Sequence, residues 1–259
     1  MVQRAARRPD FLVLRTTEPT ESAAIEPHFL YPKTEGLYVS IYYQDDYVTL
    51  YHGDCLEHTQ WLDADVLVTD PPYGIGWDRS SGTGISKKAH AGIANDHDTS
   101  ARDSALDAWG NKPALVFGSM KAPFPKDWRR ALVFEKPRTA GIIGTRLPWF
   151  NNWEPIFLLG NWPDQTPTQS AVIDTSWKSA SGYSGYATMT THPHTKPLDV
   201  MEKLIDACPP GVIADPFSGS GSTLVAARNL GRKAIGVELE EKYAEIIAKR
   251  LSQGAFDFA

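Results

Sequence analysis

The sequence predicts an α/β fold built on a doubly wound, mostly parallel sheet of seven strands. One observation is that short β-rich runs alternate with helical patterns along much of the chain. Another is that no amphipathic helix separates the runs 131–134 and 155–159, which predicts an antiparallel pair. The predicted strands are 48–51, 66–69, 114–117, 131–134, 155–159, 212–214 and 233–237.

Helical patterns follow several of these strands. One stretch, 224–230, comes directly after a glycine-rich turn, and Glu245 with Lys249 forms an exposed i,i+4 pair on another. Two sets of apolar residues each share one helix face: Leu198, Met201, Leu204 and Ile205; and Tyr243, Ile246, Ile247 and Leu251. In such folds ligands bind at the carboxyl ends of the strands, so the residues that follow the strands are the site candidates.

The first candidate is Asp70-Pro71-Pro72-Tyr73, directly after the predicted strand 66–69. Asp70 can accept hydrogen bonds from an amino group on an aromatic ring, which localises the nitrogen lone pair. Pro71 cannot continue the strand ladder, and its carbonyl is a second acceptor. Tyr73 offers a face on which a base rotated out of a duplex could stack. Taken alone, Asp-Pro-Pro is equally typical of a turn that ends a strand.

The second candidate follows the predicted strand 212–214 and has the sequence Asp215-Pro216-Phe217-Ser218-Gly219-Ser220-Gly221-Ser222-Thr223. Its glycines permit a tight turn and close approach of a ligand, and the helix that follows presents free N–H groups. Glu238 ends the next predicted strand, at the spacing where an acid accepts hydrogen bonds from ribose hydroxyls. The pattern predicts an adenosine-binding half-site.

The charge of this turn favours one adenosine cofactor. Asp215 would repel a pyrophosphate or triphosphate, and the sequence lacks the Gly-x-x-x-x-Gly-Lys-Ser/Thr pattern of a phosphate-binding loop. S-adenosyl-L-methionine instead carries an ammonium and a sulfonium, which an acidic residue suits. We therefore expect S-adenosylmethionine as the cofactor.

With these motifs the chain resembles the amino-type DNA methyltransferases, which methylate N6 of adenine or N4 of cytosine with S-adenosylmethionine. The resemblance identifies residues 70–73 as the catalytic motif, residues 215–221 as the cofactor motif and Glu238 as the ribose contact. It covers roughly residues 40 to 251, and the catalytic motif comes first, which is the order of the family's beta group. It implies a Rossmann-like methyltransferase fold with an antiparallel edge strand.

Two further segments match family blocks. They are His192-Pro-His-Thr-Lys196-Pro197-Leu198 and Tyr47 to Cys55, whose Asp54 would contact the adenine of the cofactor. Simpler explanations are a strand exit at Asp54, a turn at His192 and a helix start at Lys196-Pro197. No metal is expected, because no second pair with ligand spacing accompanies the histidines. The residues expected to bind cofactor are Asp54, Cys55, Asp70, His192, Lys196, Pro197, Asp215, Pro216, Phe217, Ser218, Gly219, Gly221, Ser222, Thr223, Glu238 and Leu239; those expected in catalysis are Asp70, Pro71, Pro72 and Tyr73.

Composition agrees with a cytoplasmic enzyme. The 259 residues are 42% hydrophobic, no apolar run reaches membrane-spanning length, and no secretory signal is visible. Cys55 and Cys208 are too few for a disulfide framework and are most simply small buried residues. Neither lies in the Pro-Cys context of C5-cytosine methyltransferases, which favours direct transfer to an exocyclic amine.

The net charge of −5 is unexpected for a protein that contacts phosphates. Positive residues nevertheless cluster between the catalytic motif and the expected recognition segment, where they could contact double-stranded DNA and make binding sensitive to salt. The residues expected to contact DNA are Lys87, Lys88, Lys121, Arg129, Arg138, Arg146 and Lys178. A solvated surface would explain each cluster alone.

Three irregular stretches flank a methyltransferase domain predicted over residues 41–259. Residues 1–40 are expected to be a poorly ordered arm, 74–100 a mobile loop that closes over DNA, and 160–191 a short target-recognition insert. Since so short an insert can deliver few side chains to the major groove, we expect a recognition site of few base pairs or loose specificity. A second subunit could supplement it, and whether the chain forms a homodimer stays open.

The resemblance predicts in-line methyl transfer to a flipped base without a covalent enzyme intermediate. N6 of adenine is favoured, because N4-cytosine members more often carry Ser in place of Asp70. Alternatives are an N4-cytosine DNA methyltransferase, an RNA or protein amine methyltransferase, and a catalytically silent DNA-binding module.

Overall fold

The computed structural model describes residues 41–76, 93–136, 148–149, 151–164, 168–175 and 195–253. These residues belong to one unit, Tyr38–Ala259. The predicted arm, residues 1–40, lies outside the described residues.

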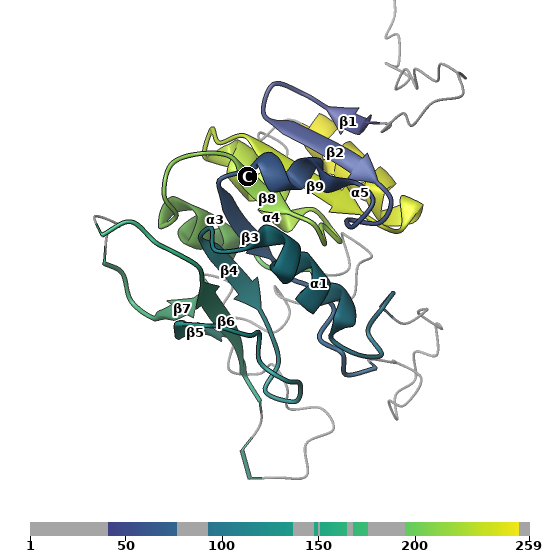
Figure 1. Cartoon of the computed structure of the whole chain (residues 1–259). Coiled ribbons are helices and arrows are strands. Elements are labelled where there is room, and N and C mark those ends of the chain that lie inside the picture. The colour runs from purple at the N-terminus through teal and green to yellow at the C-terminus, as the bar shows by residue number, and fades with distance from the viewer. Residues whose placement is uncertain are drawn as a thin grey trace, which may run out of the picture. The chain divides into compact units, whose positions relative to one another are not determined.

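The described part of the chain forms one mixed sheet and five helices (Figure 1). The strands are β1 (Ile41–Gln44), β2 (Val48–His52), β3 (Val66–Thr69), β4 (Ala114–Phe117), β5 (Arg130–Glu135), β6 (Trp153–Leu159), β7 (Val172–Asp174), β8 (Ile213–Asp215) and β9 (Ala234–Glu238). The helices are the 3-10 helix η1 (Thr59–Asp63), α1 (Ser100–Trp109), α3 (Leu198–Asp206), α4 (Ser222–Asn229) and α5 (Glu241–Ser252).

The nine described strands lie in the order β1-β2-β9-β8-β3-β4-β6-β5-β7. The strands from β2 to β4 are mutually parallel, so β8 and β9 are inserted between β2 and β3. β6 is antiparallel to both of its neighbours, β4 and β5. The doubly wound, mostly parallel fold predicted from the sequence is confirmed.

All seven predicted strands are present, but seven was too low a number, because β1 and β7 extend the sheet at its two edges. Both extra strands are short and largely exposed, so neither has the apolar run that marked the others. The pair at 131–134 and 155–159 is antiparallel as predicted, with β7 added beyond it. β1 is the antiparallel strand at the opposite edge.

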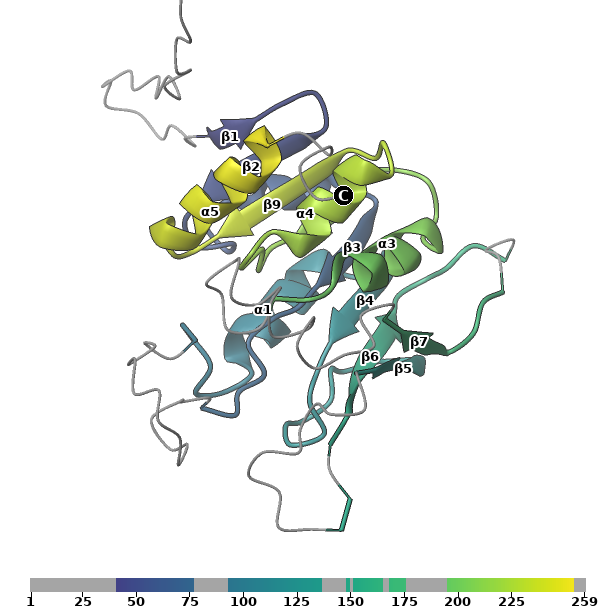
Figure 2. The same cartoon turned by 180° about the vertical axis from the view of Figure 1, so that it is seen from behind.

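Residues alternate between two cores on opposite faces of the sheet, as the period of a strand requires. In β3, Val66 and Val68 pack with α3, α4 and α5, while Leu67 packs with η1 and α1. Figure 2 shows α3, α4 and α5 on one face, and Figure 1 shows α1 on the other. On the α1 face, Trp61 stacks on Trp109 with ring centroids 5.7 Å apart.

The helices predicted from apolar periodicity are α3 and α5, and the helical stretch after the glycine turn is α4. The i,i+4 pair is also present, with Lys249 Nζ 2.7 Å from Glu245 Oε1. Helix α1 was not predicted. It begins at Ser100, where the irregular stretch 74–100 was expected to end, and its buried face includes the charged Arg102, which weakens the apolar pattern.

Candidate active site

The carboxyl ends of the parallel strands β2, β9, β8, β3 and β4 meet at one edge of the sheet. The segments that follow them line a cavity of about 270 Å³. Because β6 runs the other way, its first residues, Trp153 and Glu154, reach the same edge and also line the cavity. The catalytic and cofactor motifs, far apart in the sequence, are therefore brought into one cavity.

The turn after β8 folds tightly around two glycines. Gly219 (φ +52°) and Gly221 (φ +79°) adopt the left-handed conformation that L side chains disfavour. Gly221 N donates to Ser218 O at 2.6 Å, and Ser218 Oγ donates to the backbone oxygen of Asp215 at 2.9 Å. A Cβ at Gly221 would lie 2.9 Å from a carbon of Ile247, so space as well as conformation requires glycine there.

Glu238, at the end of β9, is buried beside this turn. Its Oε2 accepts from Gly219 N at 2.6 Å and its Oε1 from Glu240 N at 2.8 Å. Burial raises the pKa of Glu238 from 4.5 to about 7, against the opposing effect of these two backbone donors. Each carboxylate oxygen keeps a second lone pair, so hydroxyl donors from a ligand can still be accepted.

Asp215, at the end of β8, is almost fully buried, and its Oδ1 accepts from Thr69 Oγ1 at 2.7 Å and from Phe217 N at 3.2 Å. Burial raises its pKa to about 6, and the nearby charge of Asp70 acts in the same direction. When ionised, Asp215 adds negative charge to this part of the cavity, which suits a cationic ligand better than a phosphate.

The segment after β2 closes the far side of the cavity. Gly53 has φ +145°, and Leu56 N donates to Asp54 Oδ1 at 2.8 Å, which turns the chain sharply after the strand.

Cys55 is buried, and burial raises its thiol pKa to about 12. Burial likewise raises the pKa of Cys208 to about 12. Neither thiol is poised to act as a nucleophile.

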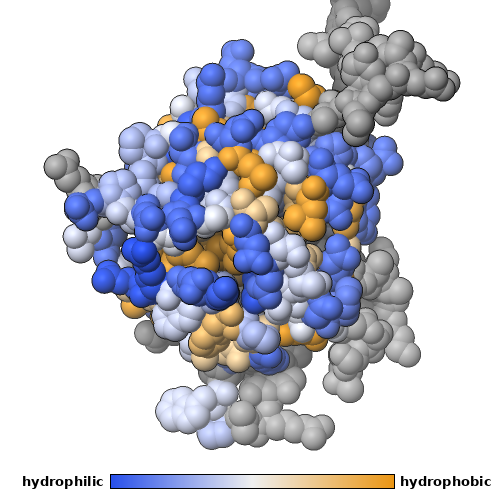
Figure 3. Space-filling model, viewed as in Figure 1, coloured by the Kyte–Doolittle hydropathy of each residue, from blue (hydrophilic) through white to orange (hydrophobic). Residues whose placement is uncertain are grey.

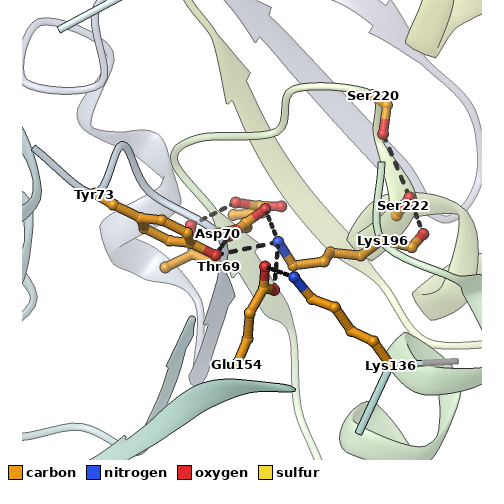
Figure 4. A network of polar contacts seen from close by, with 9 residues as sticks. Thr69, Asp70, Tyr73, Lys136, Glu154, Lys196, Ser220 and Ser222 are labelled. Atoms are coloured by element: carbon orange, nitrogen blue, oxygen red, sulfur yellow. Dashed lines mark hydrogen bonds and ion pairs between the residues drawn. The ribbon is translucent and has the colours of Figure 1, made fainter. Parts of the chain in front are cut away.

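Asp70, directly after β3, faces the cavity with both carboxylate oxygens engaged (Figure 4). Its Oδ1 accepts from the Tyr73 hydroxyl at 2.7 Å, and its Oδ2 from Lys196 Nζ at 2.6 Å. The segment that follows Tyr73 is tied down by the buried Asp96, whose Oδ1 accepts from Gly74 N at 2.8 Å.

Sequence reasoning missed several residues of this site. Glu154 Oε2 lies 3.4 Å from Lys196 Nζ, and Glu154 Oε1 lies 2.5 Å from Lys136 Nζ. Lys196 was expected only as a cofactor contact, whereas its ammonium pairs with Asp70, the residue expected in catalysis. An acidic residue in the otherwise apolar strand β6 was the one available signal for Glu154. Lys136 belongs, with Arg138 and Arg146, to one of the positive clusters expected around the pocket, but nothing local in the sequence paired it with Glu154.

The structure brings most of the predicted site residues together in the cavity. Those that line it are Asp54, Cys55, Asp70, Pro71, Pro72, Tyr73, Lys196, Asp215, Pro216, Phe217, Ser218, Gly219, Ser222, Thr223, Glu238 and Leu239. Gly221 and Pro197 are not among the lining residues; they are the N-cap residues of α4 and α3, respectively. Of the residues expected to contact DNA, Lys121 lines the cavity and Arg129 is exposed, donating to Asn161 Oδ1 at 2.8 Å.

The remaining predicted site residues lie outside the described residues: His192, Lys87, Lys88, Arg138, Arg146 and Lys178. The same holds for most of the loop predicted over 74–100 and for much of the insert predicted over 160–191.

Comparison with known proteins identifies the family. A family model described as DNA methylase, N6_N4_Mtase, matches residues 152–249. The protein described as "Putative methylase YubD" from Escherichia coli (strain K12) is 31% identical over 218 residues, which cover 77% of this chain and 88% of that protein. The chain belongs to the amino-type DNA methyltransferases.

Other relatives match this methyltransferase more locally or by fold. The type II methyltransferase M.ScaI of Streptomyces caespitosus is 47% identical over 68 residues, 26% of this chain and 22% of the relative. The structure of PvuII DNA methyltransferase (cytosine-N4-specific) has a TM-score of 0.52 at 16% identity, covering 84% of this chain and 90% of that one. At that identity the likeness shows the shared fold.

S-adenosylmethionine is the methyl donor of this family, and the cavity of this methyltransferase fits it. A buried acid, Glu238, lies beside a glycine turn, and the acidic Asp215 and Asp70 lie where a cationic group would be favoured.

None of the described helices is long and apolar enough to cross a membrane. On the face in Figure 3 the visible residues are mostly hydrophilic, with apolar ones in small separate patches.

Proposed function

We propose that this methyltransferase transfers a methyl group from S-adenosylmethionine to the N6 amine of adenine in double-stranded DNA. The observation that carries the proposal is one cavity, lined by Asp70 at the end of β3 and by the glycine turn at the end of β8. β3 and β8 are adjacent and parallel, so an acceptor for an amine and a binding turn for adenosine lie side by side.

The cofactor side of the cavity lies at β9 and β8. Glu238 would accept from the ribose hydroxyls, Asp54 and Leu239 would contact the adenine, and the residues of the glycine turn would enclose the rest. When bound there, S-adenosylmethionine supplies an electrophilic methyl group on a sulfonium. Asp215, buried behind the turn, lowers the electrostatic cost of bringing that positive charge into the cavity.

The substrate side lies at β3 and β4. Asp70 is the proposed acceptor for a hydrogen of the target amine, through the carboxylate whose oxygens accept from Tyr73 and Lys196 in this structure. Accepting that hydrogen directs the nitrogen lone pair toward the cofactor side of the cavity. The Pro71 carbonyl is the proposed second acceptor, and Tyr73 the proposed stacking face. The raised thiol pKa values of Cys55 and Cys208 support direct transfer without a covalent enzyme intermediate.

Adenine is preferred to cytosine because position 70 holds Asp, whereas N4-cytosine members of the family more often hold Ser. DNA would approach over the β4 end of the cavity, where Lys121 and Met120 are exposed at the rim and Arg129 is exposed on the same connection to β5. A short recognition segment within 160–191 predicts few base pairs of specificity, and a second copy of the chain could extend it.

The test is to incubate the protein with isotopically labelled S-adenosylmethionine and duplex DNA, and to identify the modified nucleoside by mass spectrometry. N6-methyladenine supports the proposal, and N4-methylcytosine would move the substrate to cytosine. Labelled RNA or protein in parallel reactions, with no labelled DNA, would overturn it.

Asp70→Ala tests the role of the catalytic carboxylate. Transfer should fall by at least about 100-fold, because the amine loses its acceptor, while cofactor affinity changes little. Asp206→Ala, an exposed position at the end of α3, is the matched control. Equal loss of transfer and of cofactor binding in Asp70→Ala would mean that the residue is structural.

A further inference from the structure

Four charged side chains of alternating sign form a chain at the substrate side of the cavity, and three of them, Glu154, Lys196 and Asp70, line it (Figure 4). Lys136 Nζ lies 2.5 Å from Glu154 Oε1, Glu154 Oε2 lies 3.4 Å from Lys196 Nζ, and Lys196 Nζ lies 2.6 Å from Asp70 Oδ2. The chain of charges ends at the carboxylate that the proposed function places on the target amine.

Lys196 is the most buried member of the chain, with 5% of its side chain exposed. A buried ammonium is costly unless charged partners and hydrogen bonds surround it. Here it lies between two carboxylates, and it also lies over the ring of Phe117 at 4.8 Å from the centroid. The ammonium is therefore stable where it is, with one carboxylate on either side.

The backbone of Lys196 is held as firmly as its side chain. Ser222 Oγ, at the start of α4, donates to Lys196 O at 2.9 Å, and the next residue, Pro197, is the N-cap of α3. Residue 196 is thus fixed to the helix that follows the cofactor turn, and its ammonium reaches across to Asp70. The side chain joins the two halves of the cavity.

This pairing conflicts with the proposed chemistry in one respect. The target nitrogen gains positive charge as it takes the methyl group, and a lysine ammonium hydrogen-bonded to the same carboxylate opposes that charge. In the observed arrangement Lys196 donates to Asp70 Oδ2 and Tyr73 to Oδ1, so the amine must compete with the ammonium for its acceptor. Glu154, 3.4 Å from the same ammonium, is a second acceptor within a small side-chain movement.

We propose that Lys196 is a positioning residue that holds Asp70 while no base is bound, and that Glu154 receives its ammonium when a target amine takes its place. Lys136 keeps Glu154 oriented through the other carboxylate oxygen. No covalent bond or proton changes hands in this exchange; one hydrogen bond of the ammonium moves from Asp70 to Glu154. The inference rests on the proposed function, since the amine that displaces Lys196 is the one to be methylated.

A double-mutant cycle on residues 154 and 196 tests the exchange. Glu154→Gln keeps the shape but cannot hold the ammonium as strongly, so kcat should fall by about 10-fold or more while the cofactor Kd stays within about threefold. In the Lys196→Met background no ammonium needs removal, so adding Glu154→Gln should leave kcat unchanged. The exposed Glu245→Gln on α5 is the matched control.

A second measurement does not need the Lys196→Met chain to fold. The wild-type enzyme and Glu154→Gln are each bound to two duplexes, one with the target adenine and one with purine, which lacks the amino group. Wild type should prefer the adenine duplex severalfold, because the amine reaches Asp70. In Glu154→Gln the ammonium stays on Asp70, and the preference should fall toward one.

Several results would overturn the exchange. They are a kcat in Glu154→Gln equal to that of wild type, a cofactor Kd weakened as much as kcat, an equal effect of Glu154→Gln with and without Lys196, or an unchanged preference for the adenine duplex. A wild-type enzyme that methylates no DNA overturns the proposed function instead, and is seen before any variant is made.

Discussion

Glu238→Gln tests whether burial raises the pKa of this acid in the folded protein and thereby makes the free energy of unfolding depend on pH. Burial raises the pKa of Glu238 from 4.5 to about 7. An acid whose pKa is higher in the folded than in the unfolded state binds extra protons on folding. Its stabilising contribution is therefore complete below pH 4.5 and is lost as the pH rises through 7.

The magnitude follows from the two pKa values. Between pH 5 and pH 8 the folded protein loses about 2.5 kcal/mol of stability through Glu238, since one pKa unit corresponds to about 1.4 kcal/mol. Glutamine does not titrate, so the variant should gain this amount relative to wild type over the same range. Asp215, whose pKa is raised to about 6, is present in both proteins and largely cancels from the difference.

The assay is urea unfolding followed by tryptophan fluorescence at pH 5, 6, 7 and 8, without cofactor. Glu245→Gln, on the exposed face of α5, should give a difference from wild type that stays flat with pH. A flat difference for Glu238→Gln as well, or a variant that loses stability relative to wild type as the pH rises, would refute the reasoning. It would mean that the N–H groups of Gly219 and Glu240 outweigh burial and keep the acid ionised.

Three further substitutions test the packing and the DNA-facing surface. Gly221→Ala should lower the free energy of unfolding by roughly 2–4 kcal/mol, from left-handed strain plus a clash with α5, whereas Gly231→Ala, with φ +67° and open space around it, should cost only about 1 kcal/mol. Trp61→Ala should cost about 3–5 kcal/mol, measured by urea unfolding, because the side chain is fully buried. Arg129→Ala should weaken DNA binding and reduce the slope of log K against log salt by about one, while Lys249→Ala on α5 should not.

Each of these has a contrary outcome. Equal losses at the two glycines would show that the contact with α5 has no energetic role. A small loss at Trp61 would mean that the α1 face of the sheet repacks readily. If the slope of log K against log salt is unchanged in Arg129→Ala, the connection between β4 and β5 does not contact the DNA phosphates.

Local patterns in the sequence were sufficient for much of the fold and for several of the segments that line the cavity. The glycine turn, Glu238 and the Asp70 motif follow strands whose apolar runs are unmistakable, and the parallel order places them at one edge. β1 and β7 were missed because edge strands that are half exposed lack such runs.

The chain of charges from Lys136 to Asp70 could not be predicted from the sequence, for a different reason. Lys196 and Asp70 are 126 residues apart, and their contact depends on the insertion of β8 between β3 and β9. The sequence assigned Lys196 to the cofactor, and only the fold pairs it with Asp70. An ion pair between residues far apart in the chain leaves no periodic pattern in the sequence from which it could be predicted.

Because β9 and β8 are inserted between β2 and β3, the middle of the sheet is completed last during translation. A nascent chain that has not yet reached Ile213 carries two strands whose inner edges lack their native partners. We expect such ribosome-bound chains to be protease-sensitive and to acquire resistance only when residues 213–238 have emerged, which stalled chains of graded length would reveal.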